Sequence, residues 1–90
     1  MARVVVTLKI MPKNVKTQLD TLEKKVGDII KQYSDQFKVE REAIAFGLTA
    51  LKIIFVWDEA NGGTDFLEDK LKKLKEVASV ELIDVRRAIG

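Results

Sequence analysis

Few side chains in this 90-residue sequence can carry out chemistry, because it contains neither histidine nor cysteine. The absence of cysteine excludes disulfides, thiolate metal sites and cysteine nucleophiles, and the absence of histidine removes the commonest general base and zinc ligand. The segment from Asp58 to Gly63 loosely resembles a calcium loop, but Ala60 stands at a ligand position and no glutamate closes the loop. No pair of carboxylates has a partner that would tune an acid against a base. The sequence therefore predicts no catalytic residue, no metal site and no cofactor.

The first candidate for binding is the pair Phe46–Gly47. It precedes the most apolar stretch of the chain, residues 49–57, and a glycine in such a turn allows backbone angles that other residues resist. Phe46 either packs under the edge of a sheet, which would gain about 1.5–3 kcal/mol from burial, or stands exposed as an aromatic anchor for a partner. Burial is slightly favoured on physical grounds alone, and both interpretations stay open.

The second candidate is the pair Arg86–Arg87 near the end of the chain. Adjacent residues of a strand point to opposite faces, so both arginines cannot pack inward. They form either a solvated sheet edge, with a local ion pair to Asp84 or Glu81, or a basic tip that meets phosphate or carboxylate in a partner, a task that suits the planar guanidinium. The two interpretations are evenly balanced.

Composition bounds the class of protein. The chain is 47% hydrophobic, which is enough for one core, so we expect a single domain over residues 1–90. Sixteen basic against fourteen acidic residues give a net charge of only +2, whereas nucleic-acid binders usually concentrate far more positive charge. No apolar run is long enough to span a bilayer, and the N-terminus lacks a signal-peptide pattern, so we expect a cytoplasmic protein without a membrane partner.

The hydrophobic pattern changes period along the chain. Alternation predicts strands at Arg3–Met11, Phe37–Ile44, Thr49–Trp57 and Val80–Arg87, the last with a bulge near Asp84. A three-to-four-residue period predicts one helix over Asn14–Tyr33, with Asn14 or Thr17 as its N-cap, and a second helix capped by Thr64 or Asp65. The second helix has the apolar stripe Leu67, Leu71, Leu74 and Val77.

The resulting order, β-α-β-β-α-β, predicts a ferredoxin-like α+β fold with two helices on one face of a four-stranded antiparallel sheet. In the strand at residues 49–57, the odd positions should face the helices and the even positions a more solvated face. Proteins with this fold have many different functions, so the function must be inferred from the residues of the site.

Two other uses of this fold fit the sequence less well. Single-stranded RNA binding requires aromatic residues on the open face of the first and third strands, where the alternation places only aliphatic, lysine and threonine side chains. The lysines of the second helix, at positions 70, 72, 73 and 75, are better explained as a solvated face. Direct nucleic-acid binding is thus a minor alternative.

A small-ligand regulatory domain that dimerises through its sheet is another alternative, and the sequence does not determine self-association.

Several segments together resemble the archaeal elongation factor 1-beta family, the counterpart of the catalytic C-terminal domain of the eukaryotic factor. The resemblance covers the whole chain. It is carried by Val4–Pro12 (Val-Val-Val-Thr-Leu-Lys-Ile-Met-Pro), Ile44–Leu51 (Ile-Ala-Phe-Gly-Leu-Thr-Ala-Leu), Gly62–Thr64 and Asp84–Arg87 (Asp-Val-Arg-Arg). It implies the fold predicted above and a guanine-nucleotide exchange factor for elongation factor 1-alpha, the GTPase that carries aminoacyl-tRNA, without covalent chemistry of its own.

The resemblance also implies roles for the two candidate pairs. The family's aromatic residue before the glycine of the core strand matches Phe46 and belongs to the partner-contacting surface. The eukaryotic domain reaches toward the magnesium site of the GTPase with a lysine close to its end. This chain has no lysine after Asp84, so Arg86 or Arg87 would have to supply that charge. The long N-terminal regions of the eukaryotic protein have no counterpart, which implies a stand-alone exchange module.

Overall fold

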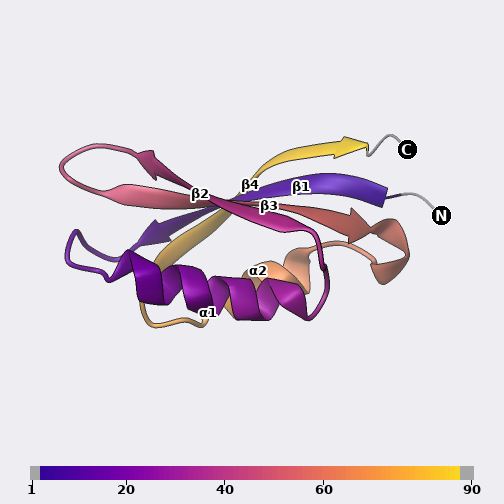
Figure 1. Cartoon of the computed structure of the whole chain (residues 1–90), viewed down its shortest axis with the longest axis horizontal. Helices are drawn as coiled ribbons and strands as arrows, with labels where there is room; N and C mark the ends of the chain where they lie inside the picture. The colour runs from indigo at the N-terminus through magenta and orange to yellow at the C-terminus, as the bar shows by residue number, and fades with distance from the viewer. Residues whose placement is uncertain (1–2, 88–90) are drawn as a thin grey trace.

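The computed structural model describes residues 3–87 and confirms the ferredoxin-like β-α-β-β-α-β fold. Four antiparallel strands form one sheet in the order β2-β3-β1-β4, and both helices lie on one face of it (Figure 1). The strands are β1 (Arg3–Pro12), β2 (Phe37–Ala43), β3 (Thr49–Asp58) and β4 (Val77–Arg87). The helices are α1 (Leu19–Lys31), α2 (Asp65–Lys72) and the short 3₁₀ helix η1 (Glu59–Asn61).

The core lies between the sheet and the two helices. As the alternation predicts, the odd positions of β3 from Leu51 to Trp57 are buried on the helix side, as are the even positions of β1 from Val4 to Ile10. The register pairs Val4 with Trp57 and Ile10 with Leu51, so the two apolar sets share a face. The helices cover them with Leu22, Val26 and Ile30 of α1 and Leu67 and Leu71 of α2.

Helix α1 begins five residues later than predicted, and neither predicted residue caps it. Its N-cap is Gln18, whose side chain makes no capping bond. Asn14 instead builds a turn of its own: its side-chain Oδ1 accepts from the Lys16 amide at 2.9 Å, and its carbonyl accepts from the Thr17 amide at 3.2 Å. Asparagine side chains compete in this way with helical hydrogen bonds, so the chain turns before the helix starts.

Both ends of α2 differ in detail from the prediction, and so does the start of β4. Thr64 occupies the N-cap position, but its hydroxyl donates to Glu68 Oε2 at 3.1 Å rather than accepting from the backbone. Val77 does not close the helical stripe, because it begins β4 and pairs with Pro12. The predicted bulge is confirmed: Thr7 pairs with Asp84 and Leu8 with Leu82, which leaves Ile83 as the extra residue.

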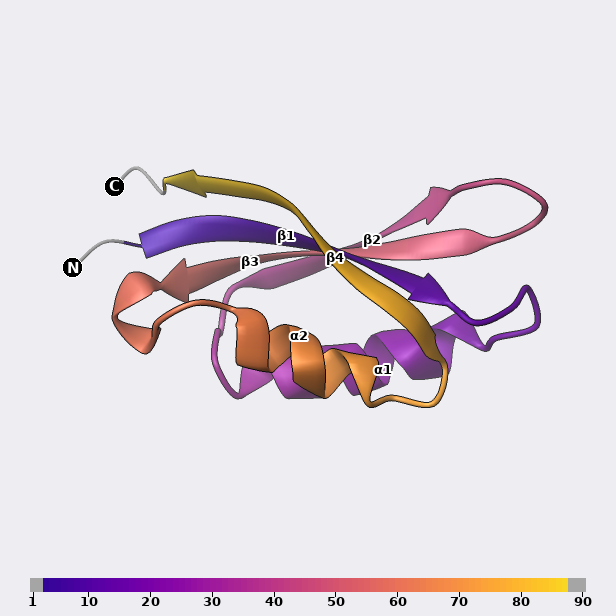
Figure 2. The same cartoon turned by 180° about the vertical axis from the view of Figure 1, so that it is seen from behind.

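The molecule is elongated, with principal extents of 41 × 21 × 18 Å. The turn between β2 and β3 lies at one end of the long axis, and the start of β1 and the end of β4 lie at the other (Figures 1 and 2). Within residues 3–87, neither helix has the length and apolar character needed to cross a membrane.

Candidate functional site

Phe46 stands at the tip of the β2–β3 hairpin with 98% of its surface exposed. The Leu48 amide donates to the Ala45 carbonyl at 3.0 Å and closes a four-residue turn whose central residues, Phe46 and Gly47, have φ angles of 57° and 80°. Positive φ at both central positions matches the type I′ turns that suit twisted hairpins. The interpretation that Phe46 packs under the sheet edge is therefore wrong, because no part of the described chain covers the turn.

The backbone at Phe46 is strained. It is the only non-glycine residue with positive φ among residues 3–87. An L-residue with a bulky side chain resists the left-handed region, at a cost of order 1–2 kcal/mol. Burial does not offset this cost, because the ring is in solvent. An exposed aromatic side chain held in an unfavourable conformation is expected where the side chain serves a contact with another molecule.

Two further apolar side chains lie at the same end. Ile44, at the base of the turn, is 39% exposed, and Val15, in the connection between β1 and α1, is 57% exposed. A Cβ built on Gly47 would lie 3.5 Å from Val15 Cγ1, so the connection and the hairpin touch. We call Val15, Ile44 and Phe46 the hairpin patch. Sequence analysis missed Val15 as a site residue because it was assigned to the first helix.

Lysines and ion pairs surround the hairpin patch. Lys13 and Lys16 flank Val15, are exposed, and form no ion pair with any residue the structure describes. Near this end, ion pairs connect β2 to α1. Arg41 of β2 binds Asp20 and Glu23 of α1, at 2.5 and 2.9 Å, and these two carboxylates raise the pKa of the guanidinium.

A second ion pair connects α1 to Glu76, the residue directly before β4, at this end of the molecule. Lys25 Nζ donates to Glu76 Oε2 at 2.5 Å, which lowers the pKa of that carboxyl. The Glu76 carbonyl in turn accepts from the Lys13 amide at 3.0 Å, so the connection that carries Val15 is held against the same residue. The ion pairs of Arg41 and Lys25, together with the hydrogen bond from the Lys13 amide, thus connect the segments that carry the hairpin patch.

The structure separates the two C-terminal arginines by face. Arg86 pairs with Val5 on the open face of the sheet, and its Nε donates to Asp84 Oδ2 at 2.8 Å. This is the local ion pair anticipated from the sequence. Arg87 pairs with Val4 on the helix side, is exposed, and forms no ion pair within the described part of the chain.

The two candidate pairs lie at opposite ends of the sheet and do not form one site. Val4 pairs with both Trp57 and Arg87, whereas Ile10, six residues further along β1, pairs with Leu51 toward the hairpin. Six residues at about 3.3 Å each put about 20 Å between these two levels, and Phe46 lies beyond them. Figure 1 shows the hairpin and the end of β4 at the two extremes of the molecule.

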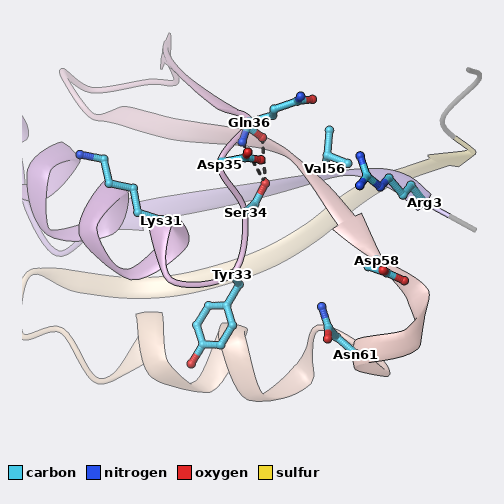
Figure 3. A pocket seen from close by; sticks show the side chains of 9 residues that line it. All are labelled: Arg3, Lys31, Tyr33, Ser34, Asp35, Gln36, Val56, Asp58 and Asn61. Atoms are coloured by element: carbon cyan, nitrogen blue, oxygen red, sulfur yellow. Dashed lines mark hydrogen bonds between the residues drawn. The ribbon is translucent and has the colours of Figure 1, made fainter. Parts of the chain in front are cut away.

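A polar pocket of about 370 Å³ lies between the α1–β2 connection and the end of β3. Its buried Ser34 is satisfied, because the hydroxyl donates to the Gln36 carbonyl at 3.0 Å and accepts from the Gln36 amide at 3.3 Å. Figure 3 shows the lining side chains spread around the rim without converging on one point. Over residues 3–87, no group of three or more acidic side chains is placed to hold a metal. This pocket offers no reactive constellation.

The fold is shared with solved structures of unrelated sequence. The ACT domain of GTP pyrophosphokinase from Chlorobium tepidum aligns with a TM-score of 0.62 at 15% identity, covering 88% of this chain and 96% of that domain. A dimeric ferredoxin-like protein from an uncultured marine organism aligns with a TM-score of 0.57 at 15% identity, covering 100% and 98%. At this identity the likeness concerns the fold alone.

Sequence comparison defines the family. The model of the EF-1 guanine nucleotide exchange domain matches residues 5–88. Elongation factor 1-beta of Methanobrevibacter smithii is 42% identical over 87 residues, covering 97% of this chain and 98% of the relative. The same factor of Methanothermobacter thermautotrophicus is 38% identical with the same coverage, and that of Nanoarchaeum equitans is 33% identical over 81 residues, covering 90% and 100%. The chain belongs to the EF-1 guanine nucleotide exchange domain family. This membership supports an exchange-factor role.

Proposed function

We propose that this protein promotes the release of GDP and the binding of GTP on translation elongation factor 1-alpha. The family match supports the exchange activity, and the name of the relatives supports this GTPase as the partner. The observation that carries the proposal in the structure is Phe46, fully exposed on a strained turn. Residues 1–90 would act as a single exchange domain without a cofactor and without covalent chemistry of their own.

Nucleotide exchange suits a protein that lacks reactive side chains, because it breaks no covalent bond. The factor must bind the nucleotide-free GTPase more tightly than the GDP-bound form, and by linkage GDP then weakens the factor's binding by the same ratio. Each tenfold gain in the rate of release requires about 1.36 kcal/mol off the barrier. A few well-placed contacts can therefore supply several tenfold increases in the rate of GDP release.

The two ends of the sheet would divide the work. Phe46 and Gly47 would anchor the hairpin in an apolar pocket of the GTPase, since aromatic side chains are enriched in protein–protein interfaces. Arg86 or Arg87 would bring positive charge toward the magnesium and phosphate region, where a cation weakens the bridge between metal and nucleotide. The four-stranded sheet would hold the anchor and the cations at a fixed separation.

The test is the rate at which a fluorescent GDP analogue leaves archaeal elongation factor 1-alpha in the presence of magnesium. Wild type should accelerate release, and Phe46→Ala and the double variant Arg86→Ala/Arg87→Ala should each lose most of the acceleration. The matched control is Lys24→Ala/Lys72→Ala, which removes two exposed positive charges from the helices. The control should retain full activity. Circular dichroism must show that all variants fold.

The possible results of this assay distinguish the exchange function from the two proposed binding sites. If well-folded wild type does not accelerate release, the proposed function is wrong. If only one variant loses activity, the function stands and the other site is discarded. Equal loss in the lysine control would show that net charge, rather than the arginine pair, governs the effect.

A further inference from the structure

An apolar groove of about 290 Å³ lies on the helix side of β4, at the end of the molecule that carries the arginines. Helix α2 begins only at Asp65 and is eight residues long, so it leaves this part of the sheet uncovered. Figure 2 shows β4 continuing past the start of α2 toward the end of the described chain. The apolar side chains that line the groove are Val4, Val6, Trp57, Leu82 and Val85.

The bulge in β4 makes this surface apolar. Leu82 pairs with Leu8 and Val85 with Val6, both on the helix side, because Ile83 is the extra residue between them. An uninterrupted alternation starting at Leu82 would instead place Asp84 on that side. Leu82 and Val85 are 43% and 50% exposed, although the residues they pair with are buried.

The wall opposite β4 is held in place. Trp57 Nε1 donates to the Gly62 carbonyl at 2.9 Å, which ties the loop after η1 to the indole. Phe66 packs against the same indole, with 5.7 Å between the ring centroids, and Tyr33 lies 6.1 Å away. A Cβ built on Gly62 or Gly63 would meet nothing within 4 Å, so the groove is open beside this loop.

Charge completes the surface. Arg87 follows Val85 by two residues on the same face of β4, about 6.6 Å further along the strand. It has no ion-pair partner in the described chain, whereas Arg86 is turned to the other face and bound to Asp84. Glu59 and Asp65 line the loop side of the groove. The groove therefore has an apolar centre and carboxylates along one wall, and Arg87 lies just beyond its lining on the same face of β4.

We infer that this groove receives an apolar side chain of the nucleotide-free GTPase, and that Arg87 binds a carboxylate adjacent to that side chain in the same segment. The inference rests on the proposed function and adds an apolar docking site at the end of the sheet that carries the arginines. The volume lies just below the range of about 300–1,000 Å³ typical of small-molecule pockets, which favours a protruding side chain. Arg87 favours an anionic group there, and the acidic loop wall repels a segment that carries only anions.

The experiment compares Val85→Asn with Ile83→Asn. Both positions are exposed on β4, but only Val85 lines the groove. Calorimetry should show Val85→Asn binding nucleotide-free elongation factor 1-alpha about tenfold more weakly than wild type, and Ile83→Asn within about twofold of it. Arg87→Gln should weaken binding about tenfold, whereas the control Lys72→Gln, which removes an exposed positive charge from α2, should stay within about twofold of wild type. Because both contacts go to one segment, Val85→Asn/Arg87→Gln should lose less than the product of the single effects.

A measurement on wild type guards against variants that fail to fold. In methyl NMR spectra, addition of the nucleotide-free GTPase should shift the signals of Val85 and Leu82 strongly. Wild-type binding with unshifted Val85 and Leu82 signals, or equal weakening by Val85→Asn and Ile83→Asn, overturns the groove and leaves the exchange function intact. Wild-type dimerisation that Val85→Asn abolishes also overturns it, because the occupant would then be a second copy. If wild type neither binds nor accelerates release, the proposed function falls together with this inference.

Discussion

Phe46 and Arg87 lie at opposite ends of one four-stranded sheet, in a molecule whose longest extent is 41 Å. Both are exposed, and both lie near apolar side chains that are exposed to solvent and do not belong to the buried core. The large hydrophobic side chains exposed among residues 3–87 divide accordingly. Val15, Ile44 and Phe46 lie at the hairpin, and Phe66, Leu82, Ile83 and Val85 lie toward the other end or on β4. A partner that contacts both ends must span the sheet, so changes at the two ends should weaken binding independently.

The strain at Phe46 predicts that its replacement by asparagine separates stability from activity. Asparagine tolerates the left-handed region and is favoured before glycine in type I′ turns. Phe46→Asn should therefore raise the free energy of unfolding by about 0.5–1 kcal/mol while it abolishes most of the exchange activity. Urea unfolding and nucleotide-release assays on the same preparations test this. Lower stability in Phe46→Asn would show that the ring supports the fold after all.

The contact between Val15 and the hairpin predicts that Val15 contributes to binding. Val15→Ser removes exposed apolar surface from the hairpin patch, so it should weaken binding to the GTPase by roughly three- to tenfold. Its effect on the free energy of unfolding should stay within about 0.5 kcal/mol, because the side chain is mostly in solvent. Calorimetric titration measures the first quantity and urea unfolding the second. Unchanged affinity would confine the anchor to Phe46 and Ile44.

The Lys25–Glu76 pair predicts a pH-dependent contribution to stability. The hydrogen bond from Lys25 is the main cause of the lowered pKa of Glu76 in the folded state. The contribution is therefore fully present above the unfolded-state pKa, about 4.3, and is lost as pH falls through the lower folded-state value. The difference in unfolding free energy between wild type and Glu76→Gln should shrink as pH falls below about 4.3. Lys25→Met should remove the largest part of this pH dependence, because the Glu76 backbone hydrogen bond and Lys75 also lower the pKa of Glu76. A difference that stays constant from pH 7 to pH 3 would contradict the assignment.

The fold was predictable because burial on one face of a strand imposes a period of two over many residues. Val4 to Ile10 and Leu51 to Trp57 are apolar at every second position, and the structure pairs these positions. Boundaries were harder to predict. Val77 continues the helical spacing from Leu74, and only its long-range pairing with Pro12 places it in β4. Asn14 precedes an apolar stripe as a cap would, but its side chain closes a local turn first.

The candidate site was predictable in residue type and not in exposure. Nothing in the local sequence states whether another segment covers Phe46, and a single aromatic ring in a turn is equally compatible with burial. The two arginines were correctly assigned to opposite faces, because alternation is a local property. The groove beside Val85 escaped prediction because it depends on where the bulge falls and how soon α2 begins, both of which are set by contacts between distant segments.

Gly27 and Gly47 predict opposite effects of the same substitution. Gly27 lies inside α1 without a positive φ, and an added Cβ would meet the Phe37 ring at 3.5–3.6 Å, an ordinary contact. Gly27→Ala should therefore stabilise the protein by up to about 1 kcal/mol through its helix propensity. Gly47 has a φ of 80°, so Gly47→Ala should destabilise by about 1 kcal/mol or more and disturb the turn that holds Phe46. Urea unfolding of both variants tests the pair. Destabilisation by Gly27→Ala would mean that the α1–sheet packing cannot accept a methyl group, and that close packing rather than chance keeps glycine at this position.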